Sequence, residues 1–305
     1  MQDRKPARVI RTMPRRRADG RSLAPELTAT TALHASILHQ QELLDKALLR
    51  LSRAITPKAV HGTRTAARRL RAMLCAFRRA LNHTAFRQYV AALQQLAHDL
   101  DALREADVTQ HMLVNLSPDH RGQGRVQLEG LKAKFAQSRT REVGDLRSAM
   151  GTEGWSARRV KLRDAASSRT LVIETQESMS SMTRRVLTRR RRRLRAALGY
   201  RGQRPRRLHK IRLKIKTLRY LLEQCESAGC RTVRAEVKQL RELQDCLGDL
   251  HDVWCLRRSL RRYRRQRATN ELSTDIETRR TELIHSFHKH RRALRRLWRA
   301  ARNAK

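Results

Sequence analysis

The chain has 305 residues, of which 70 are lysine or arginine and 28 are aspartate or glutamate, so its formal net charge is +42. A charge of this size exceeds what solubility requires and predicts a polyanionic partner: nucleic acid, inorganic polyphosphate, an anionic membrane or a charged granule surface. Aromatic residues make up only 4% of the chain. Modules that bind single-stranded nucleic acid usually stack bases on aromatic side chains, so the composition argues against that class. Non-specific binding of duplex DNA needs no aromatic residues and stays open.

The cysteine pattern and the hydropathy indicate the setting of the protein. The cysteines form no C-x-x-C pair and lie at apolar helix positions: Cys75, Cys225, Cys230, Cys246 and Cys255. This pattern predicts reduced thiols in a cytoplasmic protein. No run of 18 apolar residues occurs, so we expect no transmembrane segment. Residues 1–22 are rich in arginine and lack an apolar stretch, and we interpret them as a basic disordered tail.

The composition and the hydrophobic periodicity predict an all-α fold, because leucine and alanine dominate the apolar residues and runs of β-branched residues are almost absent. In the first half we expect four helices, over about residues 24–55, 57–81, 84–115 and 124–150. In the second half we expect four more, over about residues 169–198, 205–227, 230–267 and 272–300. Thr56 is the expected N-cap of the second helix, with Pro57 at its first position.

Two pairs of segments repeat along the chain. "VHGTRTAARRLR" (60–71) and "LHKIRLKIKTLR" (208–219) share a histidine and cations at an offset of 148 residues, from His61 to His209. "LAHDLDALREADV" (96–108) and "LQDCLGDLHDVWC" (243–255) align at an offset of 147. The repeat predicts two pseudo-symmetric four-helix bundles, over about residues 24–155 and 169–300, within one domain spanning 23–303.

The repeated helices each carry cations on one face. At about 100° per residue, the first set lies within an arc of about 80° opposite the apolar face: His61, Arg64, Arg68 and Arg71, here named the first stripe. The same angles in the second copy are taken by His209, Arg212, Lys216 and Arg219, the second stripe. A basic helix face is most often simply solvated. However, like charges three and four residues apart repel, and the repetition predicts that the stripes face one another across a cleft that holds a polyanion.

The histidines of the stripes are expected to be neutral hydrogen-bonding residues more often than catalysts. Neighbouring cations should lower the pKa of His61 and His209, and a bound phosphate should raise it again. If both histidines face the anion, binding strengthens as the pH falls through about 6 to 7.

These segments resemble the signatures of the CHAD family, the conserved-histidine α-helical domain. The signature V-H-x-x-R-x-x-x-R-R-L-R is present at residues 60–71, and H-x-x-R-x-x-x-K-x-L-R-Y-x-x-E at 209–223. The element L-G-x-x-x-D is present at 247–252, and "READV" at 104–108 matches R-D-x-D-V with glutamate in place of the first aspartate. The resemblance covers about residues 24–300.

The resemblance implies an all-helical fold of two four-helix bundles around a basic central cavity, binding of inorganic polyphosphate, and association with polyphosphate or related storage granules in the cytoplasm. It implies phosphate contacts at nine positions: His61, Arg64, Arg68, Arg69, Arg71, His209, Arg212, Lys216 and Arg219. It implies supporting or structural roles at six others: Arg104, Glu105, Tyr220, Glu223, Asp249 and Asp252. Arg69 lies off the stripe and is expected to reach a neighbouring element. Asp101 stands where a glycine is expected, and Thr217 replaces a frequent cation.

Catalytic and metal-binding motifs have no support in the sequence. P-loop, G-x-G-x-x-G and G-x-S-x-G motifs are absent, as is the E-x-E-x-K strand of the triphosphate hydrolases to which some CHAD domains are fused. "HKH" (288–290) lacks cysteine or carboxylate partners in the sequence, and the basic runs at 188–195, 261–267 and 291–301 are interpreted as solvated helix faces that could extend a phosphate track. We therefore expect a non-enzymatic polyphosphate-binding protein without metal or cofactor. The alternative is a histone-like protein that binds nucleic acid non-specifically.

Overall fold

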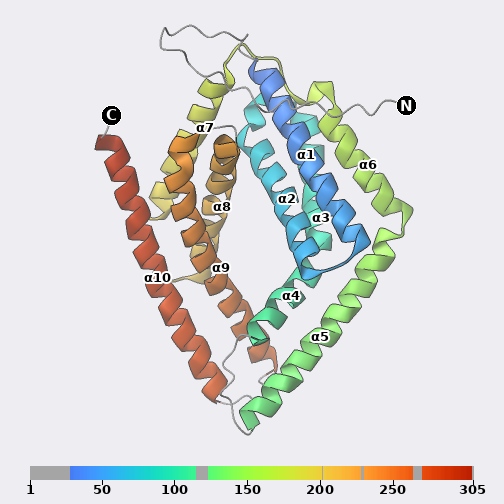
Figure 1. The fold of residues 1–305 in the computed structure, drawn as a ribbon, viewed down its shortest axis with the longest axis vertical. Coiled ribbons are helices and arrows are strands. Elements are labelled where there is room, and N and C mark those ends of the chain that lie inside the picture. Colours follow the sequence, from blue (N-terminus) through green and yellow to red (C-terminus); the bar gives the residue numbers. More distant parts are fainter. Residues whose placement is uncertain (1–27, 115–122, 201, 228–229, 264–269, 304–305) are drawn as a thin grey trace.

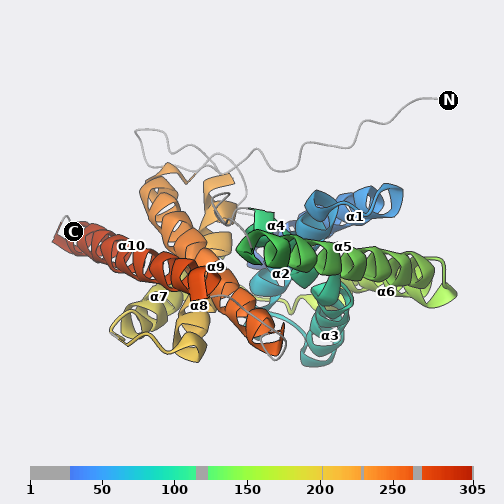
Figure 2. The same ribbon diagram turned by 90° about the horizontal axis from the view of Figure 1, so that it is seen from below.

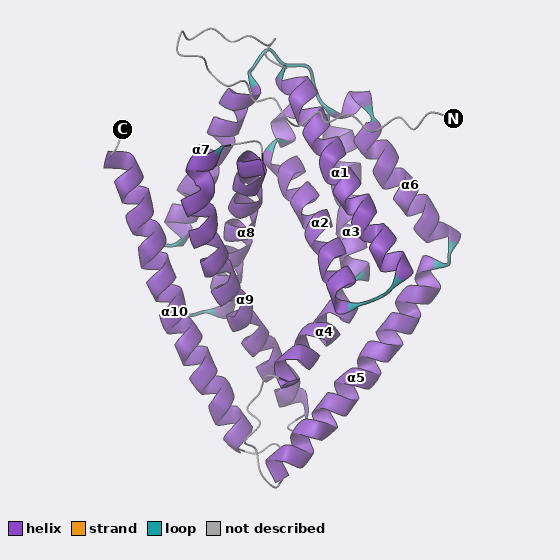
Figure 3. Ribbon diagram, viewed as in Figure 1, coloured by secondary structure: helices purple, strands orange, loops and turns teal. Residues whose placement is uncertain are grey.

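The computed structural model describes residues 28–114, 123–200, 202–227, 230–263 and 270–303. Within these residues the chain is almost entirely helical, and its β-structure is limited to two isolated bridges (Figure 3). The all-α prediction is therefore confirmed. The basic tail predicted over residues 1–22 lies outside the described residues.

The described helices divide between the two halves of the chain. The first half contains α1 (Ala29–Arg53), α2 (Pro57–Ala76), the 3-10 turn η1 (Arg78–Ala80), α3 (His83–Asp99), α4 (Asp101–Val114), α5 (Gln123–Met150) and α6 (Glu153–Ser167). The second half contains the turn η2 (Arg169–Leu171), α7 (Met179–Ala197), α8 (Pro205–Ser227), the turn η3 (Arg231–Val233), α9 (Arg234–Tyr263) and α10 (Asn270–Asn303). None of the described helices combines the length and apolar character needed to cross a membrane.

The prediction of four helices in the first half is wrong, because its described residues form six α-helices. The expected helix over 84–115 is broken at Leu100, which is fully buried, and α4 starts afresh at Asp101. No glycine or proline lies at this break, so the apolar periodicity predicts one continuous helix across it. The side chain of Asp101 pairs with Arg64 of α2, a tertiary contact that periodicity does not report.

The segment 153–178 also departs from the prediction. Residues expected to form a loop after 150 form α6, whose N-cap Thr152 accepts a hydrogen bond from the backbone N–H of Trp155 at 3.3 Å. The expected helix start near 169 is wrong, because α7 begins ten residues later at Met179. The intervening chain is held by backbone hydrogen bonds to the α2–α3 connection, from Asn82 N–H to Leu171 O and from Ile173 N–H to Ala80 O, each 2.9 Å.

The helix that carries the first stripe agrees with the prediction. Thr56 caps α2 by accepting from Ala59 N–H at 3.1 Å, and Pro57 is the first helical residue. The face opposite the stripe is buried, as expected for Leu70, Met73, Leu74 and Phe77. In α8 the expected apolar residues Ile215, Leu218 and Leu222 are fully buried, whereas Leu213 is 46% exposed. The hydrophobic pattern thus determines which way each stripe points.

The two halves meet through several helix pairs. Figure 1 shows the helices of the first half on one side and those of the second half on the other, and Figure 2 shows the same division from below. The halves are joined by packing of α2 against α8, of α1 against α7 and of α4 against α9. Helices α2 and α8 carry the two stripes, and α4 and α9 carry most of the other pair of repeated segments. The internal pseudo-symmetry itself stays a prediction.

The charged helix α7 is attached to its neighbours by a buried carboxylate. Glu236 of α9 is 7% exposed and accepts hydrogen bonds from Arg191 Nε at 3.0 Å and from Trp298 Nε1 of α10 at 2.8 Å. The hydrogen bond to Glu236 raises the pKa of Arg191. One side chain therefore links α7, α9 and α10.

Replacing Glu236 by alanine should destabilise the fold, because it leaves the partly buried Arg191 and the Trp298 N–H without their acceptor. We expect the free energy of unfolding to fall by about 2–3 kcal/mol. Denaturant unfolding measures this change. Glu282→Ala, which removes an exposed ion pair with Arg279 at 3.0 Å, should cost less than about 1 kcal/mol. Equal losses in the two variants would contradict the role of Glu236.

Candidate anion-binding site

The two stripes come together where α2 packs against α8 (Figure 1). Charges from one helix act on groups of the other. Lys216 of α8 lowers the pKa of His61 on α2, and Arg212 of α8 lowers the pKa of Arg68 on α2. The structure therefore places cations that are 148 residues apart in the sequence within electrostatic reach of one another.

Arg64 of the first stripe is buried and has its own partners. It is 6% exposed, its Nη1 donates to the carbonyl oxygen of Ala97 at 2.8 Å, and it forms an ion pair with Asp101. Its charge is offset, and its hydrogen bonds fasten α2 to the α3–α4 break. Its place in the structure is that of a helix-joining residue.

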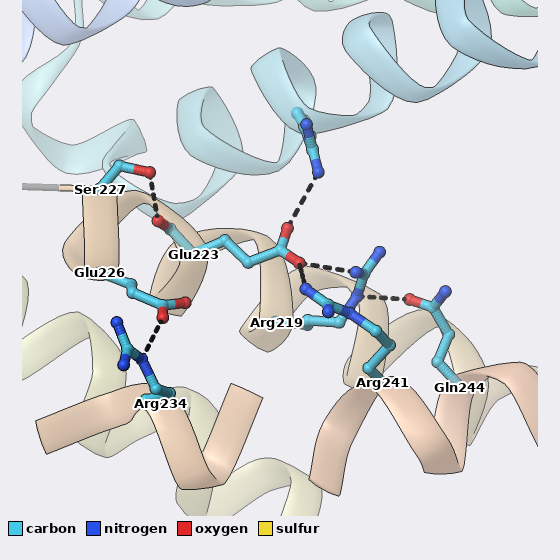
Figure 4. Close-up of polar contacts among 8 residues, drawn as sticks. Arg219, Glu223, Glu226, Ser227, Arg234, Arg241 and Gln244 are labelled. Atoms are coloured by element: carbon cyan, nitrogen blue, oxygen red, sulfur yellow. Dashed lines mark hydrogen bonds and ion pairs between the residues drawn. The ribbon is translucent and has the colours of Figure 1, made fainter. Parts of the chain in front are cut away.

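Glu223 collects cations from three helices (Figure 4). Its carboxylate accepts from Arg69 of α2 at 3.1 Å, from Arg219 of α8 at 2.7 Å and from Arg241 of α9 at 3.2 Å. The ring of Tyr220 lies under two of these guanidiniums, 5.5 Å from Arg69 and 4.9 Å from Arg219. We name these five residues the Glu223 clamp. Arg69 thus reaches a neighbouring element, as predicted, and the positive charge of Arg219 is paired with Glu223 within the clamp.

Three cations between the helices keep no such partner. Arg68, Arg212 and Lys216, here named the central cations, form no ion pair within 4 Å with any residue whose side chain the structure describes. All three are half-buried. The Nε of Arg212 is buried without a hydrogen-bond partner among the described atoms.

The pKa values of the central cations record their burial and mutual repulsion. Burial, together with Arg212, Arg68 and Arg219, lowers the pKa of Lys216 to about 7, against a small opposing effect of Asp252. Burial and Arg64 lower the pKa of Arg68 to about 10. A partly buried group of like charges is destabilised until an anion joins it.

The difference between Arg64 and Arg212 follows from one residue in each half. The alignment at an offset of 147 places Asp101 opposite Gly248, and Arg64 corresponds to Arg212 at an offset of 148. Asp101 pairs with Arg64, whereas Gly248 lies beside Arg212 and offers no carboxylate. The departure of Asp101 from the family pattern therefore neutralises the first arginine and leaves the second available.

Three histidines line the same region, and burial with neighbouring cations lowers the pKa of each. Burial lowers the pKa of His61, and the positive charges of Arg104 and Lys216 lower it further. Burial and Arg212 lower the pKa of His209. Its ring centroid lies 5.0 Å from that of His251 on α9, whose pKa falls to about 4. The lowered pKa values of His61 and His209 agree with the prediction. The role of His251 was missed, and its place inside the "LGDLHD" segment was the available signal.

The predicted supporting residues divide into two groups. Arg104 of α4 and Asp252 of α9 act on one another's pKa across the α4–α9 contact, so they belong to the central region. Burial raises the pKa of Asp249, and Arg279 of α10 opposes this effect. Glu105 is exposed and helps to raise the pKa of Cys255. Asp249 and Glu105 therefore lie at the edge of the site.

Arg71, at the far end of the first stripe, belongs to another part of the surface. It acts on the thiol of Cys75, one turn further along α2. Cys75 lines a cavity formed with α7. The basic central cavity that the family implies stays a prediction. Groups of three or more metal-ligating side chains do not occur among the described residues.

Comparisons with known proteins agree with this architecture. The sequence matches the family model of the CHAD domain over residues 31–261. No curated protein matches the sequence. Two solved structures are similar: "PptA from Streptomyces chartreusis", with a TM-score of 0.66 and 18% identity over 90% of this chain and 100% of that one, and "Crystal structure of the CHAD domain from the plant Ricinus communis", with a TM-score of 0.64 and 18% identity over 89% and 94%.

The matched region spans most of the chain and contains every central cation and the whole Glu223 clamp. At 18% identity the two structures support the fold, while the family model matches the sequence itself. The chain belongs to the CHAD domain family.

Proposed function

We propose that this protein binds inorganic polyphosphate between α2 and α8, with Arg68, Arg212 and Lys216 as its principal contacts, and that it performs no catalysis. Membership of the CHAD family supports a polyphosphate-related role, and its domains are generally binding domains. The observation that carries the proposal is the group of three half-buried cations without a carboxylate partner among the described side chains. A phosphate chain would supply the missing negative charge, and the planar guanidiniums suit paired phosphate oxygens.

The remaining residues of the two stripes take supporting parts in this proposal. His61 and His209 are neutral donors beside the central cations, and Arg104 adds charge from α4. Four other arginines contact the phosphate only at its edge. Asp101 pairs with Arg64, and Glu223 pairs with Arg69 and Arg219. The fourth, Arg71, lies too far along α2. The Glu223 clamp, with Asp252, keeps the cations in place.

Polyphosphate fits the described surface better than single-stranded nucleic acid does. The large hydrophobic residues that are exposed among the described ones include no aromatic ring on which a base could stack. Tyr220 is buried beneath two guanidiniums. An unbranched chain of phosphates needs only the charge. The same net charge of +42 would let the protein coat a polyphosphate granule in the cytoplasm, which is the location that we propose.

Replacing the central cations together, as Arg68→Gln, Arg212→Gln and Lys216→Gln, should weaken the binding of long-chain polyphosphate at least about 100-fold, since each charge-assisted contact contributes about 1.5–3 kcal/mol. The dependence of affinity on salt should also weaken. Titration calorimetry at several salt concentrations measures both. The matched control is Arg141→Gln, Arg147→Gln and Arg296→Gln, which removes the same charge from exposed positions on α5 and α10.

Equal losses in the two variants would mean that general charge and not a site binds the anion. The nucleic-acid alternative is tested with the unaltered protein. Long-chain polyphosphate should displace duplex DNA at equal phosphate concentration. If DNA displaces polyphosphate instead, the proposed function is wrong.

Gly248→Asp should weaken polyphosphate binding without unfolding the protein, because it gives Arg212 the carboxylate that Asp101 gives Arg64. A Cβ atom at Gly248 would lie 3.5 Å from Arg212 Nη2, an ordinary contact, so the side chain has room. Gly248→Ala is the control: it adds the Cβ alone and should leave affinity nearly unchanged while stabilising α9 by up to about 1 kcal/mol. Equal affinities for the two variants would show that Arg212 does not contact the ligand.

Binding should weaken as the pH rises above 7. Burial and the neighbouring cations hold the pKa of Lys216 at about 7 in the free protein, and a bound phosphate raises it. Below pH 7 Lys216 is already charged; above pH 7 binding must take up a proton, which lowers affinity by up to about tenfold per pH unit. Calorimetry between pH 6 and 9 should show this slope in the unaltered protein. It should be lost in Lys216→Met and kept in Lys214→Met, an exposed lysine of the same helix.

A further inference from the structure

A second basic region lies at the other end of the first stripe. The end of α2, the turn η1, the segment 173–177 and α7 line a cavity of about 1060 Å³. Eight arginines and two glutamates line it. None of the central cations and none of the residues of the Glu223 clamp is among the lining residues.

The arginines of this cavity come from two separate segments and face one another. Arg78 and Arg79 lie in η1, and Arg189 and Arg193 lie in α7. The pKa of Arg189 is lowered by Arg193 first, and also by Arg79 and Arg78 across the cavity. These four side chains are exposed and form no ion pair with any described side chain. Like charges are thus held together here without a counter-charge of their own.

The acidic residues of the cavity offset little of this charge. Glu177 is engaged by Arg185, whose Nη1 donates to it at 2.7 Å, and Glu174 is exposed. At the junction of α2 and α7, the half-buried Arg190 donates to the carbonyl oxygen of Cys75 at 3.1 Å. Burial and Arg193 lower the pKa of Arg190. The cavity therefore has one hydrogen-bonded, half-buried arginine in its wall as well as exposed arginines around it.

The basic run at 188–195 has two distinct parts in the structure. Arg191 pairs with Glu236, and Arg195 lies 5.3 Å over the ring of Trp298, so both face α9 and α10. Arg189, Arg190, Arg192 and Arg193 line the cavity. The interpretation of this run as a solvated helix face agrees with the exposed Arg189, Arg192 and Arg193, whereas Arg191 departs from it by pairing with the buried Glu236. The extension of a phosphate track stays a prediction.

We propose that the cavity between η1 and α7 is a second anion site of this protein, separate from the central cations, and that it takes condensed phosphate. The cavity is concave, and guanidiniums approach it from both walls, which suits a thin flexible chain of phosphates. A DNA duplex carries its phosphates on the outside of a stiff rod, and its width keeps it outside such a cavity. Binding at this site does not require binding at the central cations.

The experiment uses tripolyphosphate, a short condensed phosphate, and a full-length chain in which the central cations are already replaced by Arg68→Gln, Arg212→Gln and Lys216→Gln. Four further substitutions, Arg78→Gln, Arg79→Gln, Arg189→Gln and Arg193→Gln, remove the cavity charges. The matched control adds Arg141→Gln, Arg147→Gln, Arg296→Gln and Arg299→Gln, which are four exposed arginines of α5 and α10. Calorimetry measures the affinity, and circular dichroism confirms that each variant is folded.

We expect the chain that lacks the central cations to keep binding tripolyphosphate. The cavity substitutions should then weaken this binding at least about tenfold, and the control substitutions should change it by less than about threefold. Equal effects of the two sets would overturn the second site and leave the proposed function intact. Conversely, if replacement of the central cations leaves binding unchanged while the cavity substitutions abolish it, the second site stands and the proposed function falls.

The alkylation rate of Cys75 tests whether the ligand occupies the cavity. Cys75 lines the cavity, whereas Cys230 does not. Tripolyphosphate should slow the alkylation of Cys75 by iodoacetamide, measured by mass spectrometry of its peptide, while the rate at Cys230 stays constant. This protection should persist in the control variant and disappear in the cavity variant. If Cys75 is not protected in the control variant, the ligand does not occupy the cavity and the proposal is wrong.

Discussion

The central constraint on this structure is the repulsion between the cations that α2 and α8 bring together. Hydrophobic burial sets this geometry, because Leu70 and Leu74 of α2 and Ile215 and Leu218 of α8 are fully buried and turn the opposite faces toward one another. Each stripe would be an ordinary solvated surface on an isolated helix. Packed together, the two become a half-buried group of like charges, and the lowered pKa of Lys216 is the direct result.

The protein offsets this repulsion selectively. Glu223 serves three arginines from three helices, and Asp101 serves Arg64. Glu223 joins the halves through Arg69, and Asp101 joins α2 to α4 within the first half, so the margins of the stripes are neutralised and the centre stays cationic. Because Gly248 stands where the first half has Asp101, the uncompensated charge is greater on the side of α8. An anion site inferred from the two sequence signatures alone would be symmetric, whereas the described site is not.

Helix α7 illustrates how one basic segment can serve two purposes. The arginines that face α9 and α10 are matched by Glu236 and by the ring of Trp298, and they attach the helix to the core of the second half. The arginines on its other side meet those of η1 around a cavity. The periodicity of the helix separates these groups, since residues three or four positions apart share a face. The amino-acid composition of the basic run at 188–195 does not show which arginines pack on the core and which line the cavity.

Much of the architecture was determined by the sequence itself. The all-α fold, the start of α2, the bounds of α8, the buried faces of both helices and the family signatures all depend on residues close together in the chain, for which helical periodicity and capping are sufficient. The break at Leu100, the helix α6 and the extended segment before α7 were not predicted, because contacts with distant segments stabilise them. Only the tertiary structure decided which arginines pair with a carboxylate. Arg69 and Glu223 are separated by 154 residues, and Arg64 and Arg68, one turn apart, differ because only Arg64 has a carboxylate within reach. An ion pair acts over a few ångströms in space, and no local pattern in the sequence specifies that distance.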